Sequence, residues 1–249
     1  MTFRKNKLHL PQVTLVAVTG IDIKKTLYAL WRSQINIMFN RVLLITDNKL
    51  DFYSKKIEVE LTNNYALNSI DAYSKYIVFE LYKHIDTEFA LIVQADGYVL
   101  HSKKWSDDFL KYDYIGAPWR IKPDAYIDPF ENHQRVGNGG FSLRSTKLLN
   151  TPLLHNVEWD INHNNFYKHM GINSRAEDGI ICVHNRHIYE KAGNNFAPVK
   201  IALKFSCEQK VSEYTGESTF GYHKNFPKLW ERLVDLVYRS FFNMKYFNL

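Results

Sequence analysis

The feature that most constrains the fold of this chain is an apolar run, residues 89–93, that ends abruptly in the polar sequence Gln94-Ala95-Asp96-Gly97. A short, uniformly apolar run is typical of a strand buried on both faces. Open α/β sheets bind ligands beyond the carboxyl ends of their strands. We therefore expect Asp96 at a ligand-binding edge, where a carboxylate can hold a divalent cation bound to phosphates. The alternative is that Asp96 only stabilises a turn before Gly97.

The first half of the chain repeats this pattern and alternates it with helical segments. The order β-α-β-β-α-β predicts an α/β fold, Rossmann-like, with a mostly parallel sheet flanked by helices. Two of the strand ends carry Thr19 and Asp47. The expected strands are residues 13–20, 41–47, 57–61 and 89–93, and the expected helices are residues 22–36 and 69–84.

The second half is less regular, but nothing in it suggests a linker. Residues 112–119 predict another strand, and Ser145 is a good N-cap for a following helix. A final amphipathic helix is expected from Pro227 to about Tyr246. We expect a single domain over residues 1–249, with two halves, about 1–105 and about 106–225, that share one sheet, followed by the helix in 226–249.

Composition excludes some classes of function. The net charge of +6 favours an anionic partner, but the basic residues are dispersed, so no nucleic-acid partner is expected. The two cysteines, Cys182 and Cys207, do not have the spacing of a zinc site and are too few for a disulfide-rich fold. This cysteine content is typical of a protein in a reducing compartment. No run resembles a signal peptide or a membrane span, which favours a cytoplasmic location.

Three further motifs can carry chemistry. The glycines of residues 137–140 permit close approach of the backbone to a ligand, or form a turn or bulge. The pair Glu177-Asp178 can supply a general base, or it can be two acids at a helix N-terminus. His223 can bind a metal or a phosphate, or it can be structural.

Together, these motifs resemble the GT-A class of nucleotide-sugar glycosyltransferases. The resemblance spans about residues 13–225 and rests on the order of an acid at 96, glycines at 137–140, acids at 177–178 and a histidine at 223. The segments Gln-Ala-Asp-Gly-Tyr-Val-Leu, Tyr-Ile-Gly-Ala-Pro-Trp, Gly-Asn-Gly-Gly-Phe-Ser-Leu-Arg and Glu-Asp also look like a bacterial family catalogued as a domain of unknown function and placed near glycosyltransferases. Gln94 departs from the pattern, because it replaces the first acid of the DxD-type metal motif.

The resemblance implies a GT-A-like fold and an inverting transfer of a hexose-type sugar from a UDP-sugar. Residues 1–105 would then bind the nucleotide-sugar and residues 106–225 would carry the acceptor and catalytic groups. Asp178 would be the catalytic base, and Asp96 and His223 would hold Mn²⁺ or Mg²⁺. The expected donor contacts are Thr19, Asp47, Gln94, Asp96 and Lys224, and the expected acceptor contacts are Trp119, Gly139, Gly140 and Glu177.

The expected acceptor is a glycan or glycolipid of bacterial surface polysaccharide synthesis, such as lipopolysaccharide or capsule. The C-terminal helix mixes basic and large apolar residues, so it suits a peripheral contact with the inner membrane, or it packs on the core. Two other functions stay open: a metal-dependent nucleotidyltransferase, and a non-catalytic module that binds nucleotide or glycan.

Overall fold

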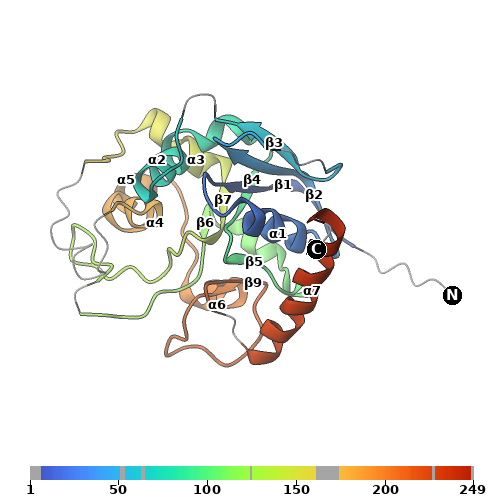
Figure 1. Ribbon diagram of the computed structural model, residues 1–249. Coiled ribbons are helices and arrows are strands. Elements are labelled where there is room, and N and C mark those ends of the chain that lie inside the picture. The colour runs from blue at the N-terminus through green and yellow to red at the C-terminus, as the bar shows by residue number, and fades with distance from the viewer. Residues whose placement is uncertain are drawn as a thin grey trace.

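The fold is built on one six-stranded sheet with helices on both faces (Figure 1). The computed structural model describes residues 7–50, 54–62, 65–123, 125–160, 174–225 and 228–247. The strand order is β3-β2-β1-β4-β7-β6. The predicted β-α-β-β-α-β order of the first half is confirmed, with β1 starting earlier than expected. These elements are β1 (Leu8–Val18), α1 (Ile23–Ser33), β2 (Ile37–Thr46), β3 (Glu58–Leu61), α2 (Ile70–Phe79) and β4 (Phe89–Val93).

The sheet is mixed, which corrects the expectation of a mostly parallel sheet. Strands β3, β2, β1 and β4 are parallel, but β7 (Phe141–Ser145) runs antiparallel to β4 and β6 (Tyr114–Ile115) runs antiparallel to β7. Val93, the last residue of β4, pairs with Phe141, the first residue of β7. The glycines of residues 137–140 therefore lie at the edge of the sheet where β4 ends.

The strand expected over residues 112–119 is much shorter than predicted. Only Tyr114–Ile115 joins the sheet. Beyond it, Pro118 has no N–H to donate and forms an isolated bridge with Val136, and the Trp119 N–H donates to Arg135 O at 2.8 Å. This part of the chain is thus held to the loop before β7 rather than to the sheet.

A second, three-stranded sheet brings the end of the chain to the Asp96 turn. Its order is β5 (Gly97–Val99), β9 (Gly221–His223) and β8 (Ser206–Cys207). Strands β5 and β9 are antiparallel, and Gly97 pairs with His223. Two motifs more than a hundred residues apart in sequence are therefore neighbours across one strand pair.

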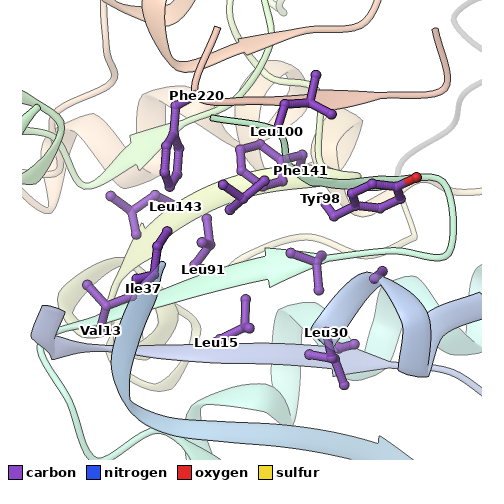
Figure 2. Close-up of a cluster of buried hydrophobic side chains, with 14 of the residues drawn as sticks. Val13, Leu15, Leu30, Ile37, Leu91, Tyr98, Leu100, Phe141, Leu143 and Phe220 are labelled. Atoms are coloured by element: carbon purple, nitrogen blue, oxygen red, sulfur yellow. The ribbon is translucent and has the colours of Figure 1, made fainter. Parts of the chain in front are cut away.

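Alternate residues of the strands pack on opposite faces of the main sheet, as the period of two requires. Leu15 and Leu91 point into a cluster with α1, Phe141 of β7 and Phe220 (Figure 2). Val16 and Ile92 point into a second cluster with α2 and α3 (Thr146–Leu154), whose predicted cap Ser145 accepts from Leu148 N. Both faces are apolar, which explains the uniformly apolar runs.

The remaining helices are short, apart from the last. The described helices do not combine the length and apolar character that a membrane-spanning segment needs. The expected C-terminal helix is confirmed, although Pro227 lies outside the described residues. The bounds are Leu81–His84 (η1), Ser102–Lys104 (η2), Asp107–Lys111 (η3), Glu177–Gly179 (α4), Ile180–His184 (η4, a π-helix), Arg186–Lys191 (α5), Val199–Phe205 (α6) and Leu229–Phe247 (α7).

Leu91→Ala should lower the free energy of unfolding by about 3 kcal/mol, because it leaves a cavity at a fully buried position of a central strand. Leu61→Ala is the matched control, since Leu61 is 40% exposed on the edge strand β3. Its cost should stay below about 1 kcal/mol. Urea denaturation of the three proteins measures both values, and equal losses would contradict this account of the core.

Candidate functional site

A cavity of about 500 Å³ opens at the carboxyl ends of β1 and β4. Thr19, Gln94 and Asp96, three of the residues predicted to bind the donor, line it. Helices α1 and α2 both contribute residues near their N-terminal ends, including Lys25 and Ser69. The first turn of a helix presents unpaired N–H groups and the positive end of its dipole, so this wall of the cavity suits an anion or a carbonyl-bearing base.

Asp47 is not among the residues that line the cavity. Its carboxylate accepts from Leu67 N at 2.8 Å and from Asn48 Nδ2 at 2.9 Å, and Leu67 does line the cavity. A Cβ on Gly20 would lie 2.7 Å from the Asp47 carboxylate and 2.5 Å from Leu67 O. Asp47 thus fixes the rim of the cavity.

The sequence Gln94-Ala95-Asp96-Gly97 is a tight hairpin turn between β4 and β5. Gln94 and Gly97 exchange backbone hydrogen bonds of 3.0 and 3.1 Å. The Gln94 side chain donates to Tyr73 Oη at 2.8 Å, which places an amide and a phenol side by side in the cavity. The turn leaves the Asp96 side chain about half exposed. Asp96 is therefore both a turn residue and a cavity residue.

His223 lies between two carboxylates. Its Nε2 is 3.4 Å from Asp96 Oδ1, and its Nδ1 is 3.3 Å from Glu208 Oε1. Burial lowers the pKa of His223, but the hydrogen bonds and charges of the two acids outweigh this and raise it to about 9. Burial raises the pKa of Asp96 and of Glu208, and the His223 imidazolium brings both below their ordinary values.

The glycine loop packs against this cluster through its backbone. A Cβ on Gly140 would lie 2.2 Å from His223 Nε2, and a Cβ on Gly139 would lie 2.0 Å from Glu177 Oε1. Real Cβ atoms do not approach other atoms so closely. The two glycines therefore let Glu177 and His223 approach the backbone of one dipeptide, and this close approach brings the three motifs together.

The acids Glu177 and Asp178 have different surroundings. Glu177 is buried, and its Oε1 accepts from Arg144 Nη2 at 2.9 Å. Asp178 is half-buried and accepts from Gly139 N at 3.1 Å and from Gly179 N at 2.7 Å. Burial and the charge of Glu177 raise the pKa of Asp178 to about 7, although its backbone hydrogen bonds oppose the change. Asp178 is thus a carboxyl group that changes protonation state near neutral pH.

Tyr73 connects the acids to the cavity. Burial, and then the charge of Glu177, raise the pKa of Tyr73 well above its ordinary value, and Asp178 adds to the effect. Tyr73 also lines the cavity beside Gln94, so the two acids lie close enough to the cavity to act on one of its lining groups.

Two other predicted residues have mainly structural surroundings. Trp119 is 3% exposed, and its ring stacks on Tyr126 with the centroids 4.2 Å apart. A sugar platform needs an open ring face, and this ring has little exposed surface. Lys224 N donates to Asp96 O at 2.8 Å, while its ammonium group lies 3.5 Å from Glu208 Oε1 and is largely exposed.

The side chains of Asp96 and His223 are compatible with a divalent cation that also binds a phosphate. Asp96 Oδ1 and His223 Nε2 are 3.4 Å apart, a separation that two adjacent ligands of one ion at about 2.1 Å can span. Within the described residues, no group of three or more His, Cys, Asp or Glu side chains could hold a metal ion. Ions held by one or two side chains commonly complete their shell with substrate phosphates and water. The imidazole favours Mn²⁺ over Mg²⁺, and must lose its proton first.

A family model described as "Protein of unknown function (DUF5672)" matches residues 56–223. The chain belongs to this family. The match contains every predicted site residue from Gln94 to His223. No curated protein matches. Among solved structures, a glycosyltransferase involved in the glycosylation of the major capsid of PBCV-1 aligns over 90% of this chain and 98% of its own, with a TM-score of 0.48 and 11% identity.

Sequence reasoning missed three residues of this DUF5672 site. Tyr73 lies within the helix expected over residues 69–84, and the sequence carries no signal that its hydroxyl group reaches the cavity. Arg144 was noted as the end of the Gly-Asn-Gly-Gly-Phe-Ser-Leu-Arg segment, and an arginine in a buried strand is a signal of a buried acid partner. Glu208 follows the two-residue strand β8 and carries no sequence signal of its own.

Gly140→Ala should destabilise this DUF5672 protein by about 2–3 kcal/mol, because its Cβ must displace the His223 ring. Gly216→Ala is the contrasting control: its Cβ would meet nothing within 4 Å, but its φ is +83°. That conformation alone costs about 1 kcal/mol. Chemical denaturation measures both values. A cost for Gly140→Ala no larger than that for Gly216→Ala would show that the loop can move away from His223.

The free energy of unfolding of Asp178→Asn, relative to that of the wild type, should increase as pH rises. The folded state keeps the Asp178 proton up to its pKa of about 7, while the unfolded state releases it near 3.8. The wild-type free energy of unfolding therefore falls between about pH 4 and about pH 7, and the asparagine variant lacks this loss. Thermal denaturation across this window should show a growing difference in Tm. Asp86→Asn, at an exposed position, is the control, and a constant difference for Asp178→Asn would contradict the raised pKa.

Proposed function

We propose that this protein is an inverting glycosyltransferase that moves a sugar from a UDP-sugar to a hydroxyl group of a glycan or glycolipid. One observation carries the proposal: Gly139 N donates to Asp178, and the next residue, Gly140, lies against His223, whose Nε2 is 3.4 Å from Asp96 in the cavity at the strand ends. In a direct displacement at a sugar carbon, the base that activates the acceptor and the site that binds the leaving diphosphate must both lie close to that carbon. Here only one dipeptide lies between the proposed base and the proposed diphosphate site.

The cavity suits the donor. A volume of about 500 Å³ is in the usual range for small-ligand sites. Thr19 and the Gln94 amide offer polar groups to a nucleoside, Asp47 holds the loop at the rim, and the N-terminal ends of α1 and α2 favour the anionic diphosphate. In this arrangement, the bond between the diphosphate and the sugar would lie on the side of the Asp96 turn that faces Gly140.

Asp178 is the proposed base. Its carboxylate takes the proton of the acceptor hydroxyl as that oxygen attacks the anomeric carbon from the face opposite the diphosphate. The bond between the anomeric carbon and the diphosphate oxygen breaks, and its electron pair leaves with UDP. A base whose pKa lies near neutral pH suits this proton transfer. Displacement from the opposite face inverts the configuration of the sugar.

Asp96 and His223 are the proposed ligands of Mn²⁺ or Mg²⁺. When bound, the ion stabilises the negative charge that develops on the leaving diphosphate. Glu208 Oε1 lies 3.3 Å from the other nitrogen of the His223 ring, where its charge would favour this orientation of Nε2. Lys224 keeps a largely exposed ammonium group beside this cluster, where it can add positive charge near the diphosphate.

The acceptor would bind at the Asp178 side of the dipeptide. The backbone of Gly139 and Gly140 would border this acceptor site, and Glu177, held by Arg144, would accept from an acceptor hydroxyl. A hexose-type donor and an acceptor from bacterial surface polysaccharide, such as lipopolysaccharide or capsule, agree with the class that the motifs resemble.

Incubation of the protein with a panel of UDP-sugars and glycan or glycolipid acceptors should release UDP in the presence of Mn²⁺. Asp178→Asn should lower kcat by about 10²–10⁴-fold with an unchanged fold, because it removes the general base. Asp86→Asn, an exposed acid outside the site, should leave the rate unchanged. Coupled detection of UDP measures the rate. Full turnover by Asp178→Asn would remove this residue as the base.

The metal is tested separately. Mn²⁺ and UDP together should raise the Tm more than UDP alone, and Asp96→Asn should abolish the extra increase. If EDTA changes neither UDP binding nor turnover, Asp96 and His223 are not metal ligands. Stabilisation by UTP but not by UDP would favour a nucleotidyltransferase instead.

A further inference from the structure

Helix α7 packs on the molecule with its acidic side chains inward. The Glu231 side chain is 1% exposed and accepts from His101 Nε2, 2.7 Å away. The Asp235 side chain is 3% exposed and accepts from Tyr98 Oη at 2.9 Å and from Arg239 Nε at 2.8 Å. These are the only acids between residues 229 and 247. Both carboxylates are thus removed from the surface and hydrogen-bonded within the fold.

The outer face of the same helix is apolar. Figure 1 shows α7 lying along the outside of the molecule, with its inner side toward α1 and the second sheet. The outward residues recur at intervals of three and four and form one stripe. We name this stripe the α7 apolar face; it consists of Leu229, Trp230, Leu233, Val234, Leu236, Val237, Phe241 and Met244, which are 41–75% exposed.

The ionisable side chains exposed on α7 are basic. Arg232 and Lys245 are exposed and, by helical spacing, lie at the two borders of the α7 apolar face. At the N-terminal end of the helix, Trp230 is 5.6 Å from His101, and the exposed Lys103 and Lys104 follow His101 in η2. The apolar face is therefore bordered by positive charge.

We propose that the α7 apolar face binds the surface of an anionic phospholipid membrane. A helix that presents large apolar side chains between cations can lie in the plane of the interface, with its rings and branched chains among the acyl chains and its cations at the phosphates. Each cation near such a surface adds attraction to anionic lipids. Charge complementarity selects this occupant over a second copy of the chain, which would present the same cations at a twofold contact.

This inference goes beyond the proposed transfer reaction and does not depend on it. Helix α7 packs against α1, and the N-terminal residues Asp22 and Lys25 of that helix region line the donor cavity. Binding through α7 would hold the cavity near the lipid surface. A glycolipid acceptor would then meet the site without leaving the bilayer.

Vesicle flotation of the protein tests the proposal. The wild type should float with vesicles of phosphatidylcholine and phosphatidylglycerol, and much less with phosphatidylcholine alone. The combined variant Leu233→Gln, Val237→Gln and Phe241→Gln should reduce the bound fraction at least about tenfold, because it removes apolar area from the centre of the face. These side chains are exposed, so circular dichroism should show an unchanged fold.

Two controls separate the α7 apolar face from general stickiness. Leu153→Gln with Leu154→Gln changes two apolar side chains of α3 that are 53% and 80% exposed, and should float like the wild type. Arg232→Gln with Lys245→Gln should lose about tenfold in binding to anionic vesicles, whereas Lys55→Gln with Lys56→Gln, at exposed positions elsewhere, should not.

Three results would overturn the proposal. The first is a wild type that does not float with anionic vesicles. The second is equal flotation of the wild type and the Leu233, Val237 and Phe241 variant. The third is a wild-type dimer in sedimentation velocity that this variant converts to a monomer, because the face would then be a contact between copies. UDP release by the variant with a soluble acceptor is measured in parallel, so loss of membrane binding and loss of catalysis are distinguished.

Discussion

The candidate site depends on the close approach of backbone and side chains at Gly139 and Gly140. A side chain at either position would overlap Glu177 or His223. The antiparallel pairing of β4 with β7 brings this loop to the edge of the sheet, and the pairing of β5 with β9 brings His223 there. Because these pairings meet at one dipeptide, the fold itself brings the cavity, the Asp96 turn and the acid pair together.

Much of the first half could be predicted from the sequence, because its signals are local. Apolar runs indicated the parallel strands, and the polar residues after them indicated the edge where the cavity lies. Ser145 was recognisable as a cap from the residue type alone. The direction of β7 had no local signal, since strand pairing is decided by contacts between distant segments. The same is true of Glu208, which β8 brings beside His223 through its pairing with β9.

Helix α7 shows a different limit of sequence reasoning. Its periodicity predicts an amphipathic helix but does not say which side faces the protein. Buried tyrosine hydroxyl groups determine which side of α7 faces the protein. Tyr28 and Tyr98 both donate to Asp235, so the core can hold a carboxylate that a purely apolar interior would exclude. With the acids satisfied inside, the apolar stripe remains outside. The orientation follows from the hydrogen-bonding capacity of the core.

The charges of the site single out one carboxylate. Arg144 neutralises Glu177, and His223 stabilises the ionised forms of Asp96 and Glu208. Among the described residues, no cation lies within salt-bridge distance of Asp178, while burial and the charges of Glu177 and Glu208 all disfavour its ionised form. Its pKa therefore rises to about 7, whereas those of Asp96 and Glu208 fall. Neighbouring acids whose pKa values are moved apart in this way take different roles: the stabilised ones hold charge, and the destabilised one exchanges a proton.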